Sequence, residues 1–98
     1  MALTITLGEH DDFYVGHRQF CLVELFIDEG FMIEDVQSGD TYEIGPEKAV
    51  EICQTVLISE GHRVLSNRTR AVFQAPENIR IYRGDLYRER GMGNADAA

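Results

Sequence analysis

Short apolar segments that alternate with polar residues dominate this chain and restrict what it can fold into. Residues 3–7 (LTITL) alternate apolar and polar side chains, and a glycine follows at position 8. Such period-two alternation is typical of a strand with one buried face. Glycines and polar turns separate the segments, so we expect about seven short strands. The expected strands cover residues 3–7, 13–15, 20–28, 31–33, 41–44, 68–74 and 78–82.

The 98 residues are enough for one domain. We expect a mainly β (α+β) fold, a small antiparallel β-sheet or barrel, spanning residues 1–90. The turn at 8–11 is expected to join the strands 3–7 and 13–15 as a hairpin. The small, polar tail 91–98 (GMGNADAA) is expected to be disordered.

Two helices are expected in addition to the strands. Pro46 and Glu47 suit the first turn of a helix, and Gly61 suits the residue that ends one, so we predict a helix over 46–60. Its apolar face would either pack on the sheet or meet a partner helix, and it comprises Ala49, Cys53, Val56 and Leu57. Asp85 is a plausible cap for a short C-terminal helix over 86–90.

The charge is unevenly distributed. The net charge is −8, yet residues 1–60 hold two basic residues against thirteen acids, whereas residues 61–98 hold seven arginines against four acids. No apolar run approaches the roughly 18–20 residues of a membrane helix. No basic region precedes the first apolar stretch, which argues against a signal peptide. We therefore expect a cytoplasmic protein without a membrane partner.

Catalytic and metal-binding patterns are not found. The three histidines are scattered, and neither Cys21 nor Cys53 lies at ligand spacing from one of them. We expect both cysteines to be reduced and buried, although one disulfide is possible in an oxidising compartment. No nucleophile motif, phosphate loop or carboxylate pair stands at a known spacing. We therefore expect no enzymatic activity, no metal and no cofactor.

The arginines of the second half are the strongest functional signal. Arg68 and Arg70 share one face of a predicted strand, and Arg80 and Arg83 lie on the next. Arg88 and Arg90 follow on the C-terminal helix, with Tyr82 and Tyr87 between them. Arginines interleaved with aromatic rings on neighbouring strands are typical of single-stranded RNA binding. The alternative is an arginine-rich face that balances the acidic half, within the chain or across a dimer.

Two blocks of the sequence resemble the carbon storage regulator (CsrA) family. Residues 67–76 (NRTRAVFQAP) are similar to its N-x-x-R-I-G-V-x-A-P run, and residues 79–87 (IRIYRGDLY) to its V-x-V-H-R-x-E-I-Y run. The N-terminal segment 3–16 is similar to its L-x-L-T-R-R…L-x-I-G hairpin. An insertion at about 29–66 separates the blocks and contains the expected extra hairpin and helix.

The resemblance implies an interleaved homodimer whose seam binds a GGA-containing loop of an mRNA or small RNA. In the dimer, the first strand of one protomer lies beside the last strand of the other. The family represses translation by covering the ribosome-binding site. By position, Thr6 and Arg83 match its RNA-binding Thr and Arg, and Ile81 and Tyr82 match the residues that flank them.

The sequence departs from the family where two arginines should follow the threonine of the first strand. Leu7 and Gly8 stand there instead, so Arg70 and Arg80, together with Arg68, are expected to supply the missing positive charge. The predicted RNA-binding residues are therefore Thr6, Arg70, Arg80, Ile81, Tyr82 and Arg83.

A second hypothesis follows from the acidic half of the chain. An acidic, compact domain could dock on a basic protein through its acidic surface or the inserted helix. It would then act as a protein-binding module or a phage-type inhibitor that mimics nucleic acid and has lost RNA binding.

Overall fold

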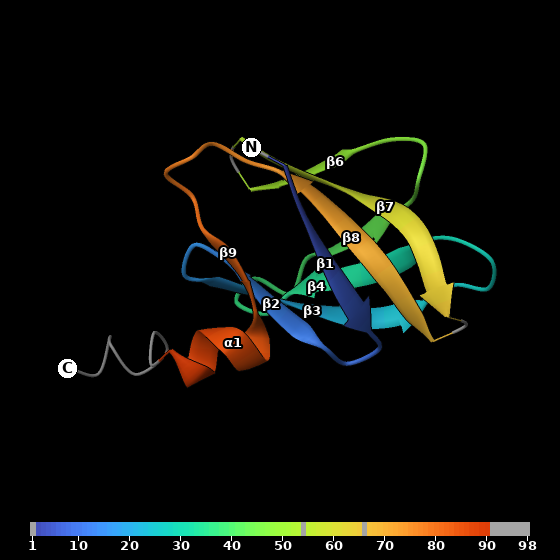
Figure 1. The fold of residues 1–98 in the computed structure, drawn as a ribbon, viewed down its shortest axis with the longest axis horizontal. Helices are drawn as coiled ribbons and strands as arrows, with labels where there is room; N and C mark the ends of the chain where they lie inside the picture. Colours follow the sequence, from blue (N-terminus) through green and yellow to red (C-terminus); the bar gives the residue numbers. More distant parts are fainter. Residues whose placement is uncertain (1, 54, 66, 91–98) are drawn as a thin grey trace.

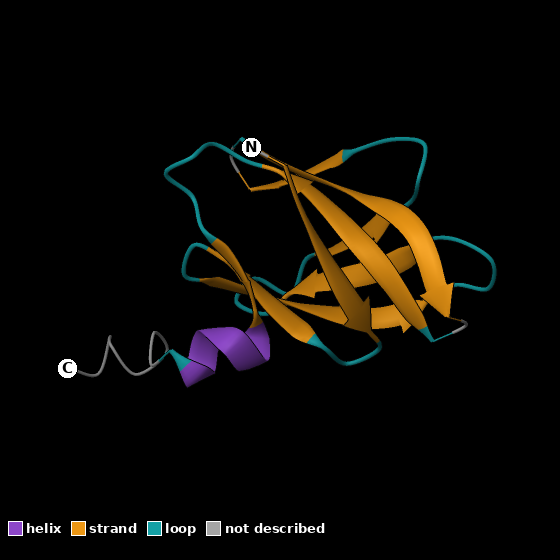
Figure 2. Ribbon diagram, in the orientation of Figure 1, coloured by secondary structure: helices purple, strands orange, loops and turns teal. Residues whose placement is uncertain are grey.

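Two antiparallel sheets facing each other form the body of the molecule (Figure 1). The computed structural model describes residues 2–53, 55–65 and 67–90. The first sheet has the strand order β1-β8-β7-β6, and the second has the order β5-β4-β3-β2-β9. A single short helix, α1, follows β9 at one end of the described chain (Figure 2). The bounds are β1 Ala2–Gly8, β2 Asp12–Val15, β3 Arg18–Leu25, β4 Phe31–Asp35, β5 Thr41–Ile44, β6 Val50–Cys53, β7 Val56–Leu65, β8 Arg68–Gln74, β9 Ile81–Arg83 and α1 Gly84–Glu89.

The core lies between the two sheets, where the alternation places every second side chain. Ile5 and Leu7 of β1 are buried, whereas Thr4 is exposed and Thr6 is half-buried. The ring of Phe13 stacks on Phe20 at 5.4 Å between centroids and meets Phe73 of the first sheet edge-on at 5.3 Å. Such aromatic contacts join strands that are distant in sequence.

The expectation of a mainly β fold is confirmed. The strands predicted at 41–44 and 68–74 have the predicted bounds, and the C-terminal helix is present with its start at Gly84. Asp85 lies in the first turn of α1, and Arg83 occupies the cap position. The predicted tail at 91–98 lies outside the described residues. Over the described part of the chain, no helix has the length and apolar character needed to cross a membrane.

The helix predicted over 46–60 is wrong, because this segment forms most of a β-hairpin. Ile52, Val56 and Ile58 are buried, whereas Leu57 is 36% exposed. Buried and exposed side chains thus alternate over residues 56–58, as they do in a strand. Residues 50–58 are rich in β-branched side chains, which favour strands. A turn at Thr55, with a φ of 69°, joins β6 to β7. Gly61 ends no helix and lies inside β7 beside a register shift.

The hairpin predicted from 3–7 and 13–15 is also wrong. All seven residues of β1 pair with β8, while β2 pairs with β3 and β9. The turn at 8–11 therefore carries the chain from the first sheet to the second. The Asp11 side chain closes this turn by accepting a hydrogen bond of 2.8 Å from the Gly8 amide, an arrangement typical of aspartate in turns.

The interleaved dimer was expected because a single protomer would lack a complete sheet. In this chain, however, β1 pairs with β8 and β9 pairs with β2 within one molecule, so one chain encloses its own core. β1 and β9 each form an edge of their sheet. A homodimer stays a prediction, but it can no longer be argued from an incomplete sheet in the single protomer.

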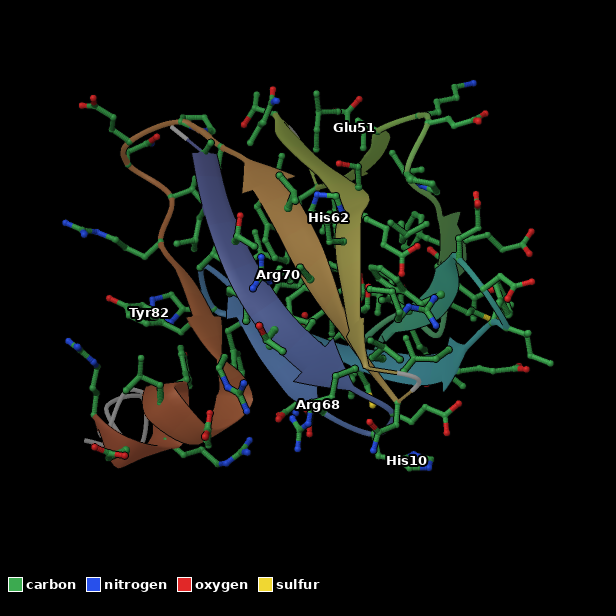
Figure 3. All side chains as sticks on the ribbon, turned by 45° about the vertical axis from the view of Figure 1, so that its right-hand side comes forward. His10, Glu51, His62, Arg68, Arg70 and Tyr82 are labelled. Atoms are coloured by element: carbon green, nitrogen blue, oxygen red, sulfur yellow. The ribbon has the colours of Figure 1, made fainter. Side chains whose placement is uncertain are left out.

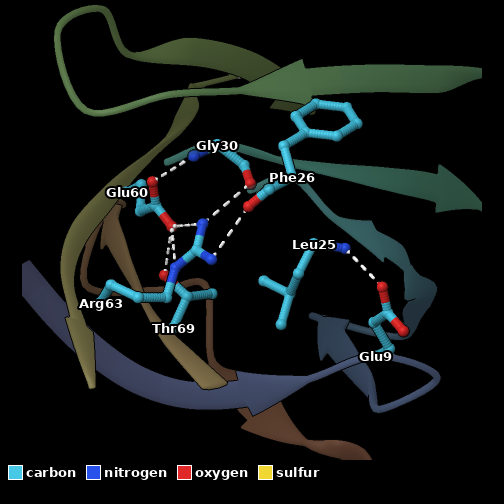
Figure 4. A network of polar contacts seen from close by, with 7 residues as sticks. All are labelled: Glu9, Leu25, Phe26, Gly30, Glu60, Arg63 and Thr69. Carbon is cyan, nitrogen blue, oxygen red and sulfur yellow. Dashed lines mark hydrogen bonds and ion pairs between the residues drawn. The ribbon is translucent and has the colours of Figure 1, made fainter. Parts of the chain in front are cut away.

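A buried polar network ties the two sheets together (Figure 4). Glu60 of β7, only 5% exposed, accepts hydrogen bonds from the Gly30 amide, the Thr69 hydroxyl and the Arg63 guanidinium. Arg63 also donates to the carbonyl oxygens of Phe26 and Gly30, at 3.0 and 3.1 Å. The loop between β3 and β4 is thereby fixed to β7 and β8.

The strand assignment of β7 predicts that substitutions at two adjacent residues lower the stability of the fold to very different extents. Val56→Asn should lower the free energy of unfolding by about 3 kcal/mol, because the side chain is fully buried. Leu57→Asn should cost less than about 1 kcal/mol. Urea unfolding followed by circular dichroism measures both. A helix would give similar losses for the two variants, and that result would contradict the strand.

The buried network predicts a large effect at Arg63. Arg63→Met leaves the Glu60 carboxylate buried without its cation and should cost about 3–5 kcal/mol. The matched control is Arg68→Met, because Arg68 is exposed and bonds to no described residue; its effect should stay within about 0.5 kcal/mol. Equal melting curves for the two variants would show that the network contributes little.

Candidate nucleic-acid interface

The outer face of the first sheet presents Thr6 next to Arg70. These residues are register partners on β1 and β8, and Gly8 is the partner of Arg68. Both arginines are exposed, and neither forms a hydrogen bond or ion pair with a described residue. A Cβ built on Gly8 would lie 3.9 Å from Cγ of Arg68, so the Arg68 side chain passes over the glycine. Two uncompensated guanidinium groups thus lie along the edge of the molecule where β1 runs.

An apolar groove separates β1 from β9, the edge strands of the two sheets. Its volume is about 320 Å³. In Figure 3, β1 runs between β9 and β8, with Tyr82 on the β9 side and His62 on the side of β7. We call this cavity the edge groove, and it is lined by Leu3, Thr4, Ile5, Thr6, Ile81, Tyr82, Arg83 and Leu86.

Arg83 bridges the edge groove at one end. Its Nη1 donates to the backbone carbonyl of Thr6 at 2.7 Å, and its Nε lies 3.2 Å from the Asp85 carboxylate. The hydrogen bond from Arg83 holds the pKa of Asp85 below its usual value. The sequence predicted an arginine that points away from a strand end. Instead, two of its three guanidinium nitrogens, Nε and Nη1, are engaged within the chain, and Nη2 makes no bond to a described residue.

Tyr82 belongs to a packed aromatic cluster. It pairs with Tyr14 across β9 and β2, and its ring meets Tyr87 edge-on at 6.3 Å. Tyr14 and Tyr87 stack at 3.7 Å, and the guanidinium of Arg90 lies 5.6 Å from the centre of the Tyr82 ring. These contacts fix the orientation of the half-buried Tyr82 ring at the wall of the groove.

Helix α1 is fastened to β2 by Asp12. Both oxygens of this carboxylate accept from Arg88, at 2.7 and 3.2 Å, and Gln19 donates to it at 2.8 Å. The hydrogen bond from Arg88 lowers the pKa of Asp12, against the opposing effect of burial. A Cβ at Gly84 would overlap the Asp12 carboxylate, so a larger residue there would have to displace this side chain from Arg88 and Gln19. Arg88, counted in the arginine cluster from the sequence, is therefore neutralised.

Most of the predicted site residues come together, but not as predicted. Thr6, Ile81, Tyr82 and Arg83 line the edge groove, and Arg70 flanks it as the partner of Thr6. The prediction of a basic stripe across neighbouring strands is wrong, because β8 and β9 belong to different sheets. Arg80 lies just before β9, on the side of the β2–β3 turn, since its carbonyl accepts from the Gly16 amide at 2.7 Å.

Sequence reasoning missed the Asp12, Gln19 and Gly84 contacts of α1 and the role of Tyr14. No local pattern indicates the contacts of Asp12 and Tyr14 with α1, because their partners Arg88 and Tyr87 lie more than seventy residues away in the chain. The glycine immediately before the predicted helix was the only signal, since a glycine in that place suits a close approach of another segment.

Seven exposed acidic residues lie on strands and turns away from the edge groove. The sheet orders place β5 at the edge opposite β9 and β6 at the edge opposite β1. The exposed acids of this region lie on β3, β5, β6 and the connecting turns, and they are Glu24, Asp28, Glu29, Asp40, Glu43, Glu47 and Glu51. Near the edge groove, Arg68 and Arg70 pair with no described residue, but carboxylates lie there too, because Asp85 pairs with Arg83, and Glu9 and Asp11 line a cavity together with Arg68.

The cysteines and histidines form no site that the structure describes. Cys21 and Cys53 are free thiols, half-buried rather than fully buried, and burial raises the pKa of each. Within residues 2–53, 55–65 and 67–90, no group of three His, Cys, Asp or Glu side chains could hold a metal ion.

The ion pair between Asp12 and Arg88 predicts a pH-dependent contribution to stability. The folded pKa of Asp12 is depressed, so the pair stabilises the fold above the unfolded pKa of about 3.9, and this contribution is lost as the pH falls through the folded pKa. At pH 7, Arg88→Met should cost about 1 kcal/mol or less, because Arg88 is half exposed. The difference from wild type, measured by urea unfolding, should shrink from pH 5 to pH 2. A constant difference would contradict the assignment.

Comparisons with known proteins found no match. No model of a known protein family matches the chain. No curated protein matches it, and no solved structure does. The likeness to the carbon storage regulator family therefore consists of the motif positions alone, and the function is argued below from charges, contacts and cavities.

Proposed function

We propose that the edge groove binds single-stranded RNA. The observation that carries this proposal is the placement of free positive charge in a chain of net charge −8. Arg68 and Arg70 flank the groove on β8, and Arg90 lies over Tyr82 on the other side, while the exposed carboxylates of the second sheet lie at the opposite edge. Grooves that combine arginines with an aromatic platform suit single strands, because phosphates and base faces are accessible together.

The groove offers each contact that an unpaired base needs. Ile81 and Leu86 provide apolar walls, and the Tyr82 ring provides a face on which a base can stack. The half-buried Thr6 hydroxyl supplies a donor and an acceptor for a base edge or a ribose hydroxyl. Arg70, beside Thr6, is placed to pair with the phosphate of the same nucleotide.

The departure at Leu7 and Gly8 is compatible with this proposal. Leu7 is fully buried, so an arginine there would be driven into the core. Arg68, whose side chain passes over Gly8, brings a guanidinium to the place where the resemblance leads one to expect an arginine. Positive charge on β8 thus substitutes for positive charge on β1.

The biological role that fits is post-transcriptional regulation. A small domain that covers a GGA-containing loop near a ribosome-binding site blocks translation by occupying the RNA, without any catalytic step. In this role Arg83 is a positioning residue, because its bond to the Thr6 carbonyl holds β9 beside β1.

The test is fluorescence anisotropy with a labelled RNA hairpin that carries a GGA loop, at low and at moderate salt. Arg70→Ala should weaken binding by about 1–3 kcal/mol, or roughly 5- to 100-fold, and should reduce the salt dependence. The matched control is Lys48→Ala, an exposed cation before β6, which should leave affinity unchanged. A wild-type protein that binds no RNA at low salt would overturn the proposal, as would equal losses for the two variants.

A second candidate function has its own observation. Ile27 is 90% exposed in the β3–β4 loop, next to Asp28 and Glu29, and Val23 on β3 is also exposed. An apolar anchor surrounded by carboxylates suits a basic protein surface. In that case the protein is a binding module or an inhibitor. Substitution of Ile27 by serine would then abolish partner binding, whereas Arg70→Ala would not affect it.

A further inference from the structure

A second cavity lies at the start of β9, next to the edge groove. Its volume is about 440 Å³, within the range of sites for small organic ligands. The turn between β2 and β3 forms one side, and the segment that leads into β9 forms the other. We call it the β9 pocket, and it is lined by Gly16, His17, Asn78, Ile79, Arg80 and Tyr82.

The backbone around the β9 pocket is held in place. Gly16 adopts a φ of 63°, which favours glycine, and its amide donates to the Arg80 carbonyl at 2.7 Å. The Ile79 amide donates to the Pro76 carbonyl at 3.1 Å, which closes the turn before β9. These two hydrogen bonds fix the backbone on both sides of the pocket.

The side chains of the pocket leave their polar groups free. His17 uses Nδ1 in a hydrogen bond of 2.8 Å with the Tyr87 hydroxyl, so its Nε2 makes no bond to a described residue. Asn78 and Arg80 are exposed and have no partner among the described residues. The walls offered by Ile79 and Tyr82 are apolar and aromatic. A flat ring can therefore pack on the walls while the rim pairs with its polar edge.

The lining of the β9 pocket carries positive charge, which favours an anionic ligand. None of its six lining residues is acidic, although the chain as a whole carries a charge of −8. Arg80 adds a free guanidinium, and Arg90 lies over the ring of Tyr82. An aromatic heterocycle with a phosphate fits this combination of apolar walls, amide and free cation.

We infer that the β9 pocket binds a single nucleobase of the same RNA strand, with Arg80 paired to its phosphate. Tyr82 lines both this pocket and the edge groove, so the two cavities share a wall and neighbouring bases of one strand can fill them. This inference rests on the proposed RNA-binding function. It adds a specificity position, because the Asn78 amide carries both a donor and an acceptor for the edge of the base.

The experiment scans single abasic nucleotides through the loop and flank of the RNA hairpin, with wild type and Asn78→Ala. At one position, loss of the base should weaken wild-type binding about tenfold and leave the affinity of Asn78→Ala almost unchanged, because the variant has already lost that contact. Asn78→Ala should itself bind intact RNA about tenfold more weakly. The matched control is Gln37→Ala, an exposed amide in the β4–β5 turn.

The outcomes separate this inference from the function on which it rests. If wild type binds RNA and this binding depends on Arg70, but Asn78→Ala behaves like wild type at every abasic position, the proposal for the β9 pocket is wrong and the proposed RNA-binding function stands. Wild type that binds no RNA overturns both. Since Asn78 is exposed and bonds to no described residue, its variant should melt like wild type, and a melting curve confirms that any loss of affinity is local.

Discussion

The buried pair of Glu60 and Arg63 is the contact on which the arrangement of the two sheets depends. Its six hydrogen bonds reach Thr69 on β8 and the backbone of the loop at Phe26 and Gly30, so they join segments of both sheets. A carboxylate in the interior is tolerated only when its lone pairs are satisfied. The pair therefore requires the β3–β4 loop to lie against β7 and β8, and this requirement fixes how the sheets face each other.

The edge groove follows from that arrangement. The first strand, β1, belongs to the first sheet, the chain crosses to the second sheet at the turn 8–11, and the last strand, β9, pairs with β2. Both terminal strands are edges, and Arg83 connects them with a bond to the Thr6 carbonyl. An edge strand has unpaired backbone groups on one side, so the meeting of two edges creates a polar-rimmed channel with an apolar floor.

Charge is distributed in a manner that suits this channel. Arginines that have carboxylate partners hold the structure together, as Arg88 does with Asp12 and Arg18 with Asp35. Arginines without described partners, namely Arg68, Arg70 and Arg80, lie near the groove and the β9 pocket. The chain thus keeps three arginines without described partners at a net charge of −8, and long-range repulsion by the acidic residues should make RNA binding sensitive to salt.

The sequence by itself determined the β character, the strands at 41–44 and 68–74 and the C-terminal helix, because alternation and capping signals are local properties. The family resemblance placed Thr6 beside Arg83 across a dimer seam, whereas the folded chain joins the two residues within one molecule. It did not determine residues 46–60, where apolar residues satisfy both periods and only burial of Ile52, Val56 and Ile58 selects the strand. It also did not determine which arginines are free, because Asp12 neutralises Arg88 from seventy-six residues away. Pairing and burial depend on contacts between distant segments, and those contacts exist only in the folded chain.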